Sequence, residues 1–133
     1  MSIRPIRLNP ACIKTLSAVE ASPDRSNQHE FNGVKALKDM FGLAKFQKTA
    51  KFSIRGTSTE AWANVTWYDA REDHPTRTEH RLYFQSNTVM AQAREGDNIL
   101  IGFESPQSLH VILIKAANHG GGLPIINSWE RTS

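Results

Sequence analysis

The sequence contains little that would place the protein in a membrane or outside the cell. None of the apolar runs in its 133 residues approaches the length of about 18 residues that crosses a bilayer. The opening segment, MSIRPIRLNP, lacks the apolar run of a secretory signal. A single cysteine, Cys12, excludes an internal disulfide and fits a reducing compartment. We therefore expect a cytoplasmic protein that does not contact membranes.

Motifs for metal binding and nucleophilic catalysis are also missing. The sequence has neither a phosphate-binding glycine loop nor a Gly-x-Ser-x-Gly elbow, and Cys12 has no cysteine partner for zinc. The histidines are scattered rather than paired at metal-ligand spacing: His29, His74, His80, His110 and His119. Three carboxylates, Asp69, Glu72 and Asp73, lie close together, but the Glu-x-Lys step of a Mg²⁺-dependent nuclease is absent. We expect a chain without catalysis or cofactor, and keep such a nuclease as an alternative.

The composition, with 39% hydrophobic and 22% charged residues, is typical of a globular domain. Alternation of apolar and polar residues predicts strands over residues 2–8, 13–19, 51–55, 61–68, 79–85, 98–104 and 109–116, with Trp62 and Trp67 as core bulk. Residues 31–41 have helical spacing that ends at Gly42, and residues 86–95 predict a second short helix.

Short polar connections between these strands favour a mainly β fold. We expect an open antiparallel pseudobarrel of about seven strands with one or two short helices. The residues 105–108, Ser-Pro-Gln-Ser, predict a hairpin between the last two strands. We expect the domain to occupy residues 1–126, with 127–133 as a tail or the start of a linker.

Positive charge is concentrated in one part of the chain. The formal net charge is +3, but residues 25–55 contain seven bases and two acids, a local net of +5. The bases are Arg25, Lys35, Lys38, Lys45, Lys48, Lys51 and Arg55. A block of this kind suits a surface that faces phosphates, and Lys45 and Lys48 are candidate phosphate contacts. A solvated lysine face is the alternative interpretation.

Two polar loops carry side chains suited to reading nucleic-acid bases, and loops of their length are uncommon in so small a domain unless they have a function. The first loop (residues 21–30) contains Asp24, Arg25, Ser26, Asn27, Gln28, His29 and Glu30. The second loop (residues 69–78), with the start of the following strand, contains Arg71, Arg77, Thr78, Glu79, His80 and Arg81. Acids placed beside arginines favour readout of base edges over simple phosphate neutralisation. Solvated loops held by local ion pairs are the alternative.

Two segments resemble the N-terminal effector-binding domain of EcoRII-like restriction endonucleases. Residues 13–18, Ile-Lys-Thr-Leu-Ser-Ala, and the polar loop ending at His29 are similar to that family's N-terminal recognition arm. Residues 67–71, Trp-Tyr-Asp-Ala-Arg, and 76–81, Thr-Arg-Thr-Glu-His-Arg, are similar to its C-terminal arm. Pro75 and His80 depart from the pattern, since the family has a lysine at the first position and a base at the second.

The resemblance implies a pseudobarrel related in fold to the plant B-three DNA-binding domain, with both arms in the major groove. Arg77, Glu79 and Arg81 fall on specificity positions of the C-terminal arm, Arg71 on a cleft position and His29 on the N-terminal arm. The implied role is that of an effector or targeting domain of a bacterial restriction endonuclease, with CCWGG (W is A or T) as the first target to test.

Catalysis would then belong to a separate C-terminal PD-(D/E)xK nuclease domain, the only part for which Mg²⁺ is expected. We expect this domain to be a monomer in isolation and to bind double-stranded DNA sequence-specifically. A barrel that binds RNA or protein is the remaining alternative.

Overall fold

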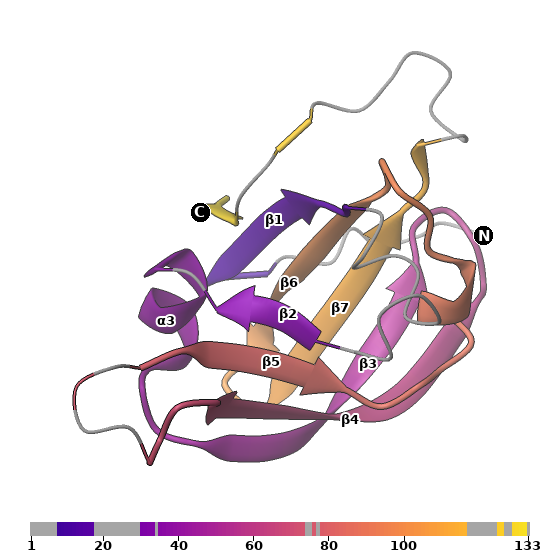
Figure 1. The fold of residues 1–133 in the computed structure, drawn as a ribbon. Helices are drawn as coiled ribbons and strands as arrows, with labels where there is room; N and C mark the ends of the chain where they lie inside the picture. Colours follow the sequence, from indigo (N-terminus) through magenta and orange to yellow (C-terminus); the bar gives the residue numbers. More distant parts are fainter. Residues whose placement is uncertain are drawn as a thin grey trace.

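Strands dominate the part of the chain that the structure describes. The computed structural model describes residues 8–17, 30–33, 35–73, 76, 78–116, 125–126 and 129–132. Its elements are β1 (Ala11–Thr15), β2 (Glu30–Gly33), α3 (Lys35–Phe41), β3 (Phe46–Ile54), β4 (Glu60–Asp69), β5 (His80–Phe84), η1 (Met90–Gln92), β6 (Asn98–Ser105), β7 (Ser108–Ile114) and β8 (Glu130–Arg131). The expected fold class is confirmed, because the protein is mainly β and its strands curve into an open half-barrel (Figure 1). Most of the strand expected over residues 2–8 lies outside the described residues.

One sheet contains all the described strands, in the order β2-β5-β4-β3-β7-β6-β1-β8. Neighbouring strands are antiparallel except β3 and β7, which run parallel from the pair Lys51 and His110 to the pair Ile54 and Leu113. The sheet is therefore largely antiparallel, as expected, with this one parallel pair among the described strands. The parallel pair arises because the long crossover through β4, β5, η1 and β6 returns the chain to β3 in the same direction. The hairpin expected at residues 105–108 is confirmed by the register of β6 and β7.

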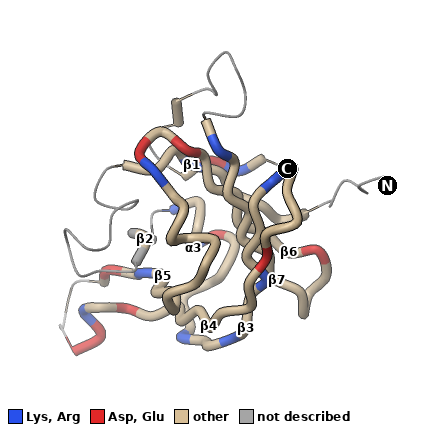
Figure 2. The backbone as a smooth tube through the Cα atoms, turned by 90° about the vertical axis from the view of Figure 1, so that its right-hand side faces the viewer, with Lys and Arg blue, Asp and Glu red and all other residues tan. Residues whose placement is uncertain are grey.

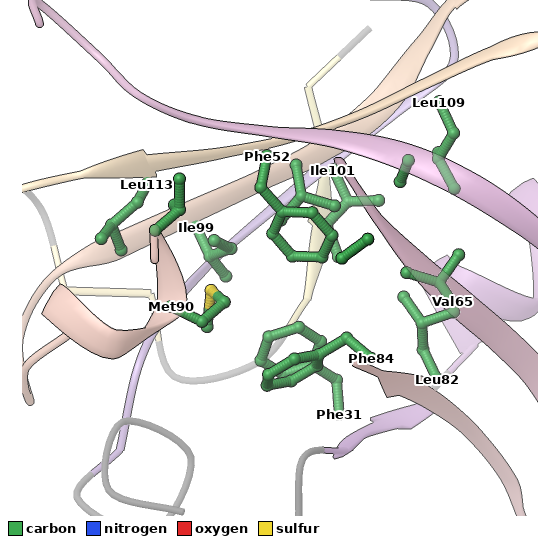
Figure 3. Close-up of a cluster of buried hydrophobic side chains, with 14 of the residues drawn as sticks. Phe31, Phe52, Val65, Leu82, Phe84, Met90, Ile99, Ile101, Leu109 and Leu113 are labelled. Carbon is green, nitrogen blue, oxygen red and sulfur yellow. The ribbon is translucent and has the colours of Figure 1, made fainter. Parts of the chain in front are cut away.

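The core lies on the concave side of the sheet, and strand alternation decides which side chains reach it. On β5, Leu82 and Phe84 are buried, whereas Arg81 and Tyr83 lie on the outer face. Phenylalanine rings from β2, β3 and β5 meet at the centre of the core (Figure 3). On β4, Trp67 is buried, but Trp62 is exposed. The expectation that both tryptophans fill the core is wrong for Trp62. Residues an odd number of positions apart on a strand point to opposite faces, and Trp62 and Trp67 are five positions apart.

A short helix follows β2 and covers one end of the half-barrel (Figure 1). The helix expected over residues 31–41 begins only at Lys35. Phe31 belongs instead to β2, where its backbone pairs with Leu82 and its side chain enters the core. Pairing with β5 therefore overrides the helical spacing at this position. Gly42, with a φ of +80°, ends the helix as expected, and its N–H donates to a carbonyl of the last turn (2.7 Å).

The second expected helix is reduced to the single turn η1. Asn87 starts it, because its side-chain oxygen accepts hydrogen bonds from the N–H groups of Val89 (3.1 Å) and Met90 (3.0 Å). The chain is extended again at Ala93, so the turn goes no further. Within the described ranges, neither this turn nor α3 is long and apolar enough to cross a bilayer.

The C-terminal segment closes the gap between the two edges of the sheet. Trp129 is buried and packs edge-on against Phe31 of β2, with ring centroids 5.6 Å apart. Directly after it, β8 pairs with β1, so that Cys12 lies opposite Arg131. The expected boundary at residue 126 is therefore corrected, because the fold extends at least to Thr132. The linker and the domain beyond it remain predictions.

Trp129→Ala should lower the free energy of unfolding by about 3–5 kcal/mol, because it leaves a cavity between the two sheet edges. Urea denaturation followed by circular dichroism measures the change. Ile125→Ala is the matched control, since Ile125 lies in the same segment but is 78% exposed. Equal effects of the two substitutions would contradict the closure by Trp129.

Candidate nucleic-acid interface

The second loop leaves the sheet from a root that Asp69 holds closed. Asp69 is the last residue of β4 and pairs with His80, the first residue of β5. Its Oδ1 accepts hydrogen bonds from the backbone N–H groups of Glu79 (2.8 Å) and Arg71 (2.9 Å). These bonds, and then the proximity of His80 and Lys38, lower the pKa of Asp69. The two ends of the loop therefore have a fixed separation and direction.

Glu79 and Arg81 form an ion pair at the start of β5. Oε2 of Glu79 accepts a hydrogen bond of 2.5 Å from Nη2 of Arg81, and the two side chains are 38% and 28% exposed. Arg81 is on the outer face of the sheet, where Tyr68 of β4 lies opposite it, and Thr78 is exposed next to Glu79. This charge-assisted bond restricts the orientation of the Arg81 guanidinium. The structure thus brings together an acid and a base that the sequence interpretation paired.

His80, a candidate base-reading residue from the sequence, faces the interior. It is only 4% exposed, and its ring stacks on Trp67 with centroids 5.1 Å apart. Its Nε2 lies 2.9 Å from the carbonyl oxygen of Leu43, and carries the proton because a carbonyl only accepts. The expectation is therefore corrected: His80 positions the neighbouring residues and does not present its ring to a ligand.

The connection between α3 and β3 lies against the root of the second loop. Nε1 of Trp67 donates to the Gly42 carbonyl (2.9 Å), and His80 binds the next carbonyl along, that of Leu43. We call residues 42–45 the 42–45 turn. Its last residue, Lys45, is exposed. Lys38 of α3 is close enough to Asp69 to lower the pKa of its carboxyl group.

Basic residues from three segments therefore lie at one end of the molecule. Lys38 comes from α3, Lys45 from the 42–45 turn, and Arg71 and Arg81 from the two sides of the second loop. Figure 2 shows basic and acidic segments mixed at the second loop, with further basic segments at the foot of β3 and β4. Elsewhere in the basic block, Lys35 is paired with Asp39 (2.8 Å). The block is thus not one continuous patch, and only part of it adjoins the second loop.

Lys48, the second candidate phosphate contact, lies on the other face of the sheet. Its register partner on β4 is Val65, a core residue, so Lys48 shares the inner face. The ammonium group lies 5.4 Å from the ring centroid of Phe103 and 5.9 Å from that of Phe46. Lys48 is half-buried over these rings and does not share the outer face with Arg81. This corrects its grouping with Lys45.

Most of the first loop lies outside the described residues. The candidate residues outside them are Asp24, Arg25, Ser26, Asn27, Gln28 and His29, together with Arg77 of the second loop. The backbone of Glu30 is described as the first residue of β2, opposite Tyr83. The first loop thus returns to the sheet beside Tyr83, and the second loop returns at His80. Three residues of β5 separate these points, about 10 Å at the usual rise of a strand.

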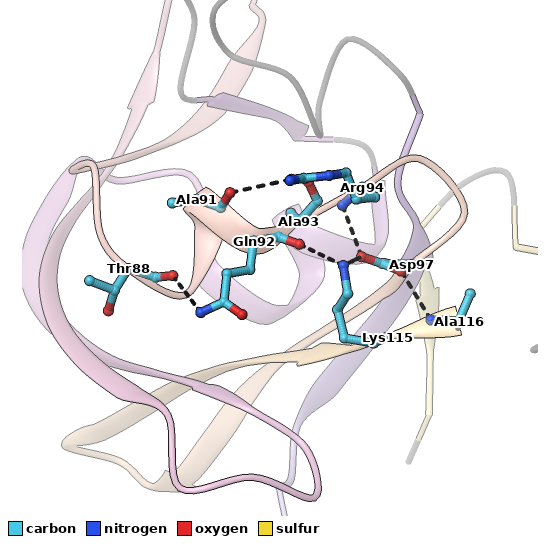
Figure 4. A network of polar contacts seen from close by, with 8 residues as sticks. All are labelled: Thr88, Ala91, Gln92, Ala93, Arg94, Asp97, Lys115 and Ala116. Carbon is cyan, nitrogen blue, oxygen red and sulfur yellow. Dashed lines mark hydrogen bonds and ion pairs between the residues drawn. The ribbon is translucent and has the colours of Figure 1, made fainter. Parts of the chain in front are cut away.

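A buried polar network supports the start of the first loop. Asp97 and Lys115 form an ion pair of 2.6 Å, and the Asp97 carboxylate also accepts N–H bonds from Arg94 (2.8 Å) and Ala116 (3.0 Å) (Figure 4). The carbonyl of Asp97 accepts the N–H of Leu16 (2.8 Å), shortly before the first loop. Sequence analysis missed this network, because only a Gly-Asp turn signals it. Its partners are satisfied, so it is a support and not a second site.

The three carboxylates of the alternative nuclease are not assembled around a common point. Two backbone N–H groups already bind Asp69, while Glu72 and Asp73 are exposed in the turn that follows. In the part of the chain that the structure describes, no group of three His, Cys, Asp or Glu residues is arranged to hold a metal ion.

Comparison with known proteins gives no identification. No protein-family model matches the chain, and no curated protein matches it significantly.

The pKa of Asp69 predicts an acid-dependent contribution to stability. Its ordinary value is 3.8, and the folded value is lower, so the charged form is favoured by folding. The contribution is present above pH 3.8 and is lost as the pH falls through the folded pKa. We expect wild type to be more stable than Asp69→Asn at pH 7 and to converge with it below pH 3.8 in urea denaturation at a series of pH values. A difference that stays constant would contradict the assigned role.

Lys48→Ala should lower the free energy of unfolding by about 0.5–1 kcal/mol, the usual strength of an exposed cation–π contact. Lys45→Ala is the matched control and should leave stability unchanged, because Lys45 is exposed. Thermal unfolding of the two variants and wild type separates these outcomes. Two variants of equal stability would contradict the ring contact of Lys48.

Proposed function

We propose that the protein is a non-catalytic domain that binds double-stranded DNA sequence-specifically, with the second loop and the start of β5 in the major groove. The observation that carries the proposal is the Glu79–Arg81 ion pair. It is partly exposed, and the backbone N–H of Glu79 is bonded to Asp69 at the root of the second loop. An oriented guanidinium presents two parallel donors, the pattern that matches O6 and N7 of guanine.

The division of charge supports base readout. A carboxylate beside the DNA repels phosphates unless its charge is already compensated. Asp69 is bonded to two backbone N–H groups, and Glu79 is bonded to Arg81. The exposed Lys45 and Arg71 are then the groups that attract phosphates, while Arg81 reads a base edge.

The spacing of the two loop roots also supports the proposal. Glu30 and His80 are separated along the sheet by about 10 Å, and the major groove is about 12 Å wide. In the proposal, the first loop, which joins β2 at Glu30, and the second loop, which joins β5 at His80, meet one groove from its two sides. The first-loop residues Asp24–His29 and the second-loop residues Arg77 and Thr78 complete the proposed interface.

The biological setting follows from the resemblance to EcoRII-like enzymes. The domain would act in the bacterial cytoplasm as an effector or targeting domain of a restriction endonuclease. A separate PD-(D/E)xK nuclease domain would supply cleavage and require Mg²⁺, and CCWGG is the first target to test. In isolation the domain would be a monomer.

Selection from a randomised duplex pool, started beside a CCWGG duplex, tests the proposal directly. We expect one preferred sequence, and Arg81→Ala should weaken binding to it by about 1–3 kcal/mol, that is, about ten- to a hundred-fold, while relaxing the preference. Arg55→Ala is the control, because Arg55 is exposed in the turn between β3 and β4, at the other end of these strands. Fluorescence anisotropy on the selected and a scrambled duplex gives both affinities.

The substitution Glu79→Gln distinguishes two effects of Glu79, its negative charge and its orientation of the Arg81 guanidinium. It removes an acid, so affinity for the scrambled duplex should rise, while loss of the fixed guanidinium plane lowers discrimination. Equal changes for Arg81→Ala and Arg55→Ala on both duplexes would overturn the proposal. Structured RNA that competes for binding as well as duplex DNA does would also overturn the proposal. Plasmid nicking in Mg²⁺ would favour the nuclease instead.

A further inference from the structure

The outer face of β5 lies between the roots of the two loops. The first loop joins β2 at Glu30, whose register partner on β5 is Tyr83, and the second loop joins β5 at His80. Figure 1 shows β2 and β5 side by side, and the two strands are antiparallel. In the proposed function, DNA held by both loops therefore lies over the stretch of β5 from His80 to Tyr83.

Arg81 and Tyr83 are the side chains of this stretch that lie on the outer face. They alternate with Leu82 and Phe84, which are buried in the core. Two residues of extended chain separate Arg81 from Tyr83, about 7 Å along the strand. Tyr83 is 41% exposed. A ligand that Arg81 contacts from this face thus has the phenol of Tyr83 beside it.

The residues around Tyr83 favour a base edge over a phosphate as its ligand. Its register partner on β4 is Thr66, whose partner on β3 is Gln47, and both are polar and uncharged. The residue opposite Tyr83 on β2 is the acid Glu30. None of these residues attracts a phosphate, and an acid repels one, whereas base edges in the major groove offer both donors and acceptors.

A tyrosine at this position is suited to reading a base edge. Its hydroxyl both donates and accepts hydrogen bonds, and its ring has only two torsions, so that ordering it costs little conformational entropy. The backbone of β5 is paired on one side with β2 and on the other with β4. Tyr83 therefore projects from a strand whose position is fixed on both sides.

We propose that Tyr83 is a second base-reading residue, whose hydroxyl forms a hydrogen bond with a base edge near the one that Arg81 contacts. This inference rests on the proposed DNA-binding function. The separation of about 7 Å along β5 corresponds to about two base-pair steps of 3.4 Å. Arg81 and Tyr83 then read different base pairs of the same groove.

The test combines Tyr83→Phe with single base-pair changes in the DNA. The probe is the duplex recovered from the randomised pool, and fluorescence anisotropy measures the affinities. The base pair at which Arg81→Ala loses its preference marks the Arg81 contact. Within about two base pairs of it, we expect one position where a changed pair weakens wild-type binding by about two- to ten-fold. Tyr83→Phe should bind the selected duplex more weakly by the same factor, show no preference at that position and keep the preference at the Arg81 position.

Trp62→Phe is the matched control. Trp62 is also an exposed aromatic residue on the outer face, but it lies on β4 four residues before Thr66, about 13 Å along that strand. It should bind both duplexes as wild type does. Tyr83→Phe should also bind the scrambled duplex as wild type does, because it removes no charge and no phosphate contact.

The outcomes separate this inference from the proposed function. If wild type shows no sequence preference, the DNA-binding proposal itself fails. If wild type selects a sequence but Tyr83→Phe binds it unchanged, the base contact of Tyr83 is overturned and the function stands. Equal losses for Tyr83→Phe on the selected and scrambled duplexes, or a preference that is unchanged at every base pair, would also overturn it.

Discussion

The stacked rings of Trp67 and His80 hold together the end of the protein that carries the proposed DNA-binding site. Both are buried, and a buried donor without an acceptor costs about 1–3 kcal/mol. Their acceptors are consecutive backbone carbonyls, those of Gly42 and Leu43. One stacking contact therefore ties the ends of β4 and β5 to the connection between α3 and β3. The second loop and the 42–45 turn project from these segments, so their relative positions depend on it.

The fold also explains how acids are accommodated beside a proposed polyanion-binding surface. Asp69 and Glu79 lie next to exposed bases, yet each is committed to a donor of the protein itself. The charge of Asp69 is used to close the loop root, and that of Glu79 to orient a guanidinium. These acids therefore restrict the geometry of the bases rather than cancel their attraction for phosphate. This is why net charge alone, at +3, is a poor guide to the surface.

Local alternation made most of the strands predictable, whereas contacts distant in sequence were not. The segments 61–68, 79–85, 98–104 and 109–116 correspond closely to β4, β5, β6 and β7. The parallel pairing of β7 with β3 and the packing of Trp129 on Phe31 join residues far apart in the chain, and no local pattern specifies them. For the same reason the local pattern predicts a helix at Phe31, since its partner on β5 is distant in sequence.

The sequence also predicts which face of the sheet each candidate strand residue occupies, once its position is compared with those of the apolar residues on the same strand. His80 is an even number of positions from Leu82 and Phe84, so the alternation of the strand already places its side chain on the inner face. Lys48 is likewise an even number of positions from Ala50 and Phe52, which are buried on the inner face. Residue type alone grouped these two with the surface bases. The 42–45 turn had a weaker signal, an apolar residue directly after the glycine that ends a helix.

Strand β5 contributes to the core with one face and to the proposed DNA-binding surface with the other. Its inner positions, His80, Leu82 and Phe84, are fixed by the core, whereas Arg81 lies on the outer face. Glu79 precedes the strand and contributes only backbone groups to the root, because its N–H donates to Asp69 and its carbonyl accepts the N–H of Ala70 (2.7 Å). Substitutions at Glu79 and Arg81 can therefore alter the proposed DNA-reading surface while the Asp69 root and the Trp67–His80 stack remain intact. In the proposed function, a new specificity at these two positions costs little stability, because Arg81 and the core residues lie on opposite faces of the same strand.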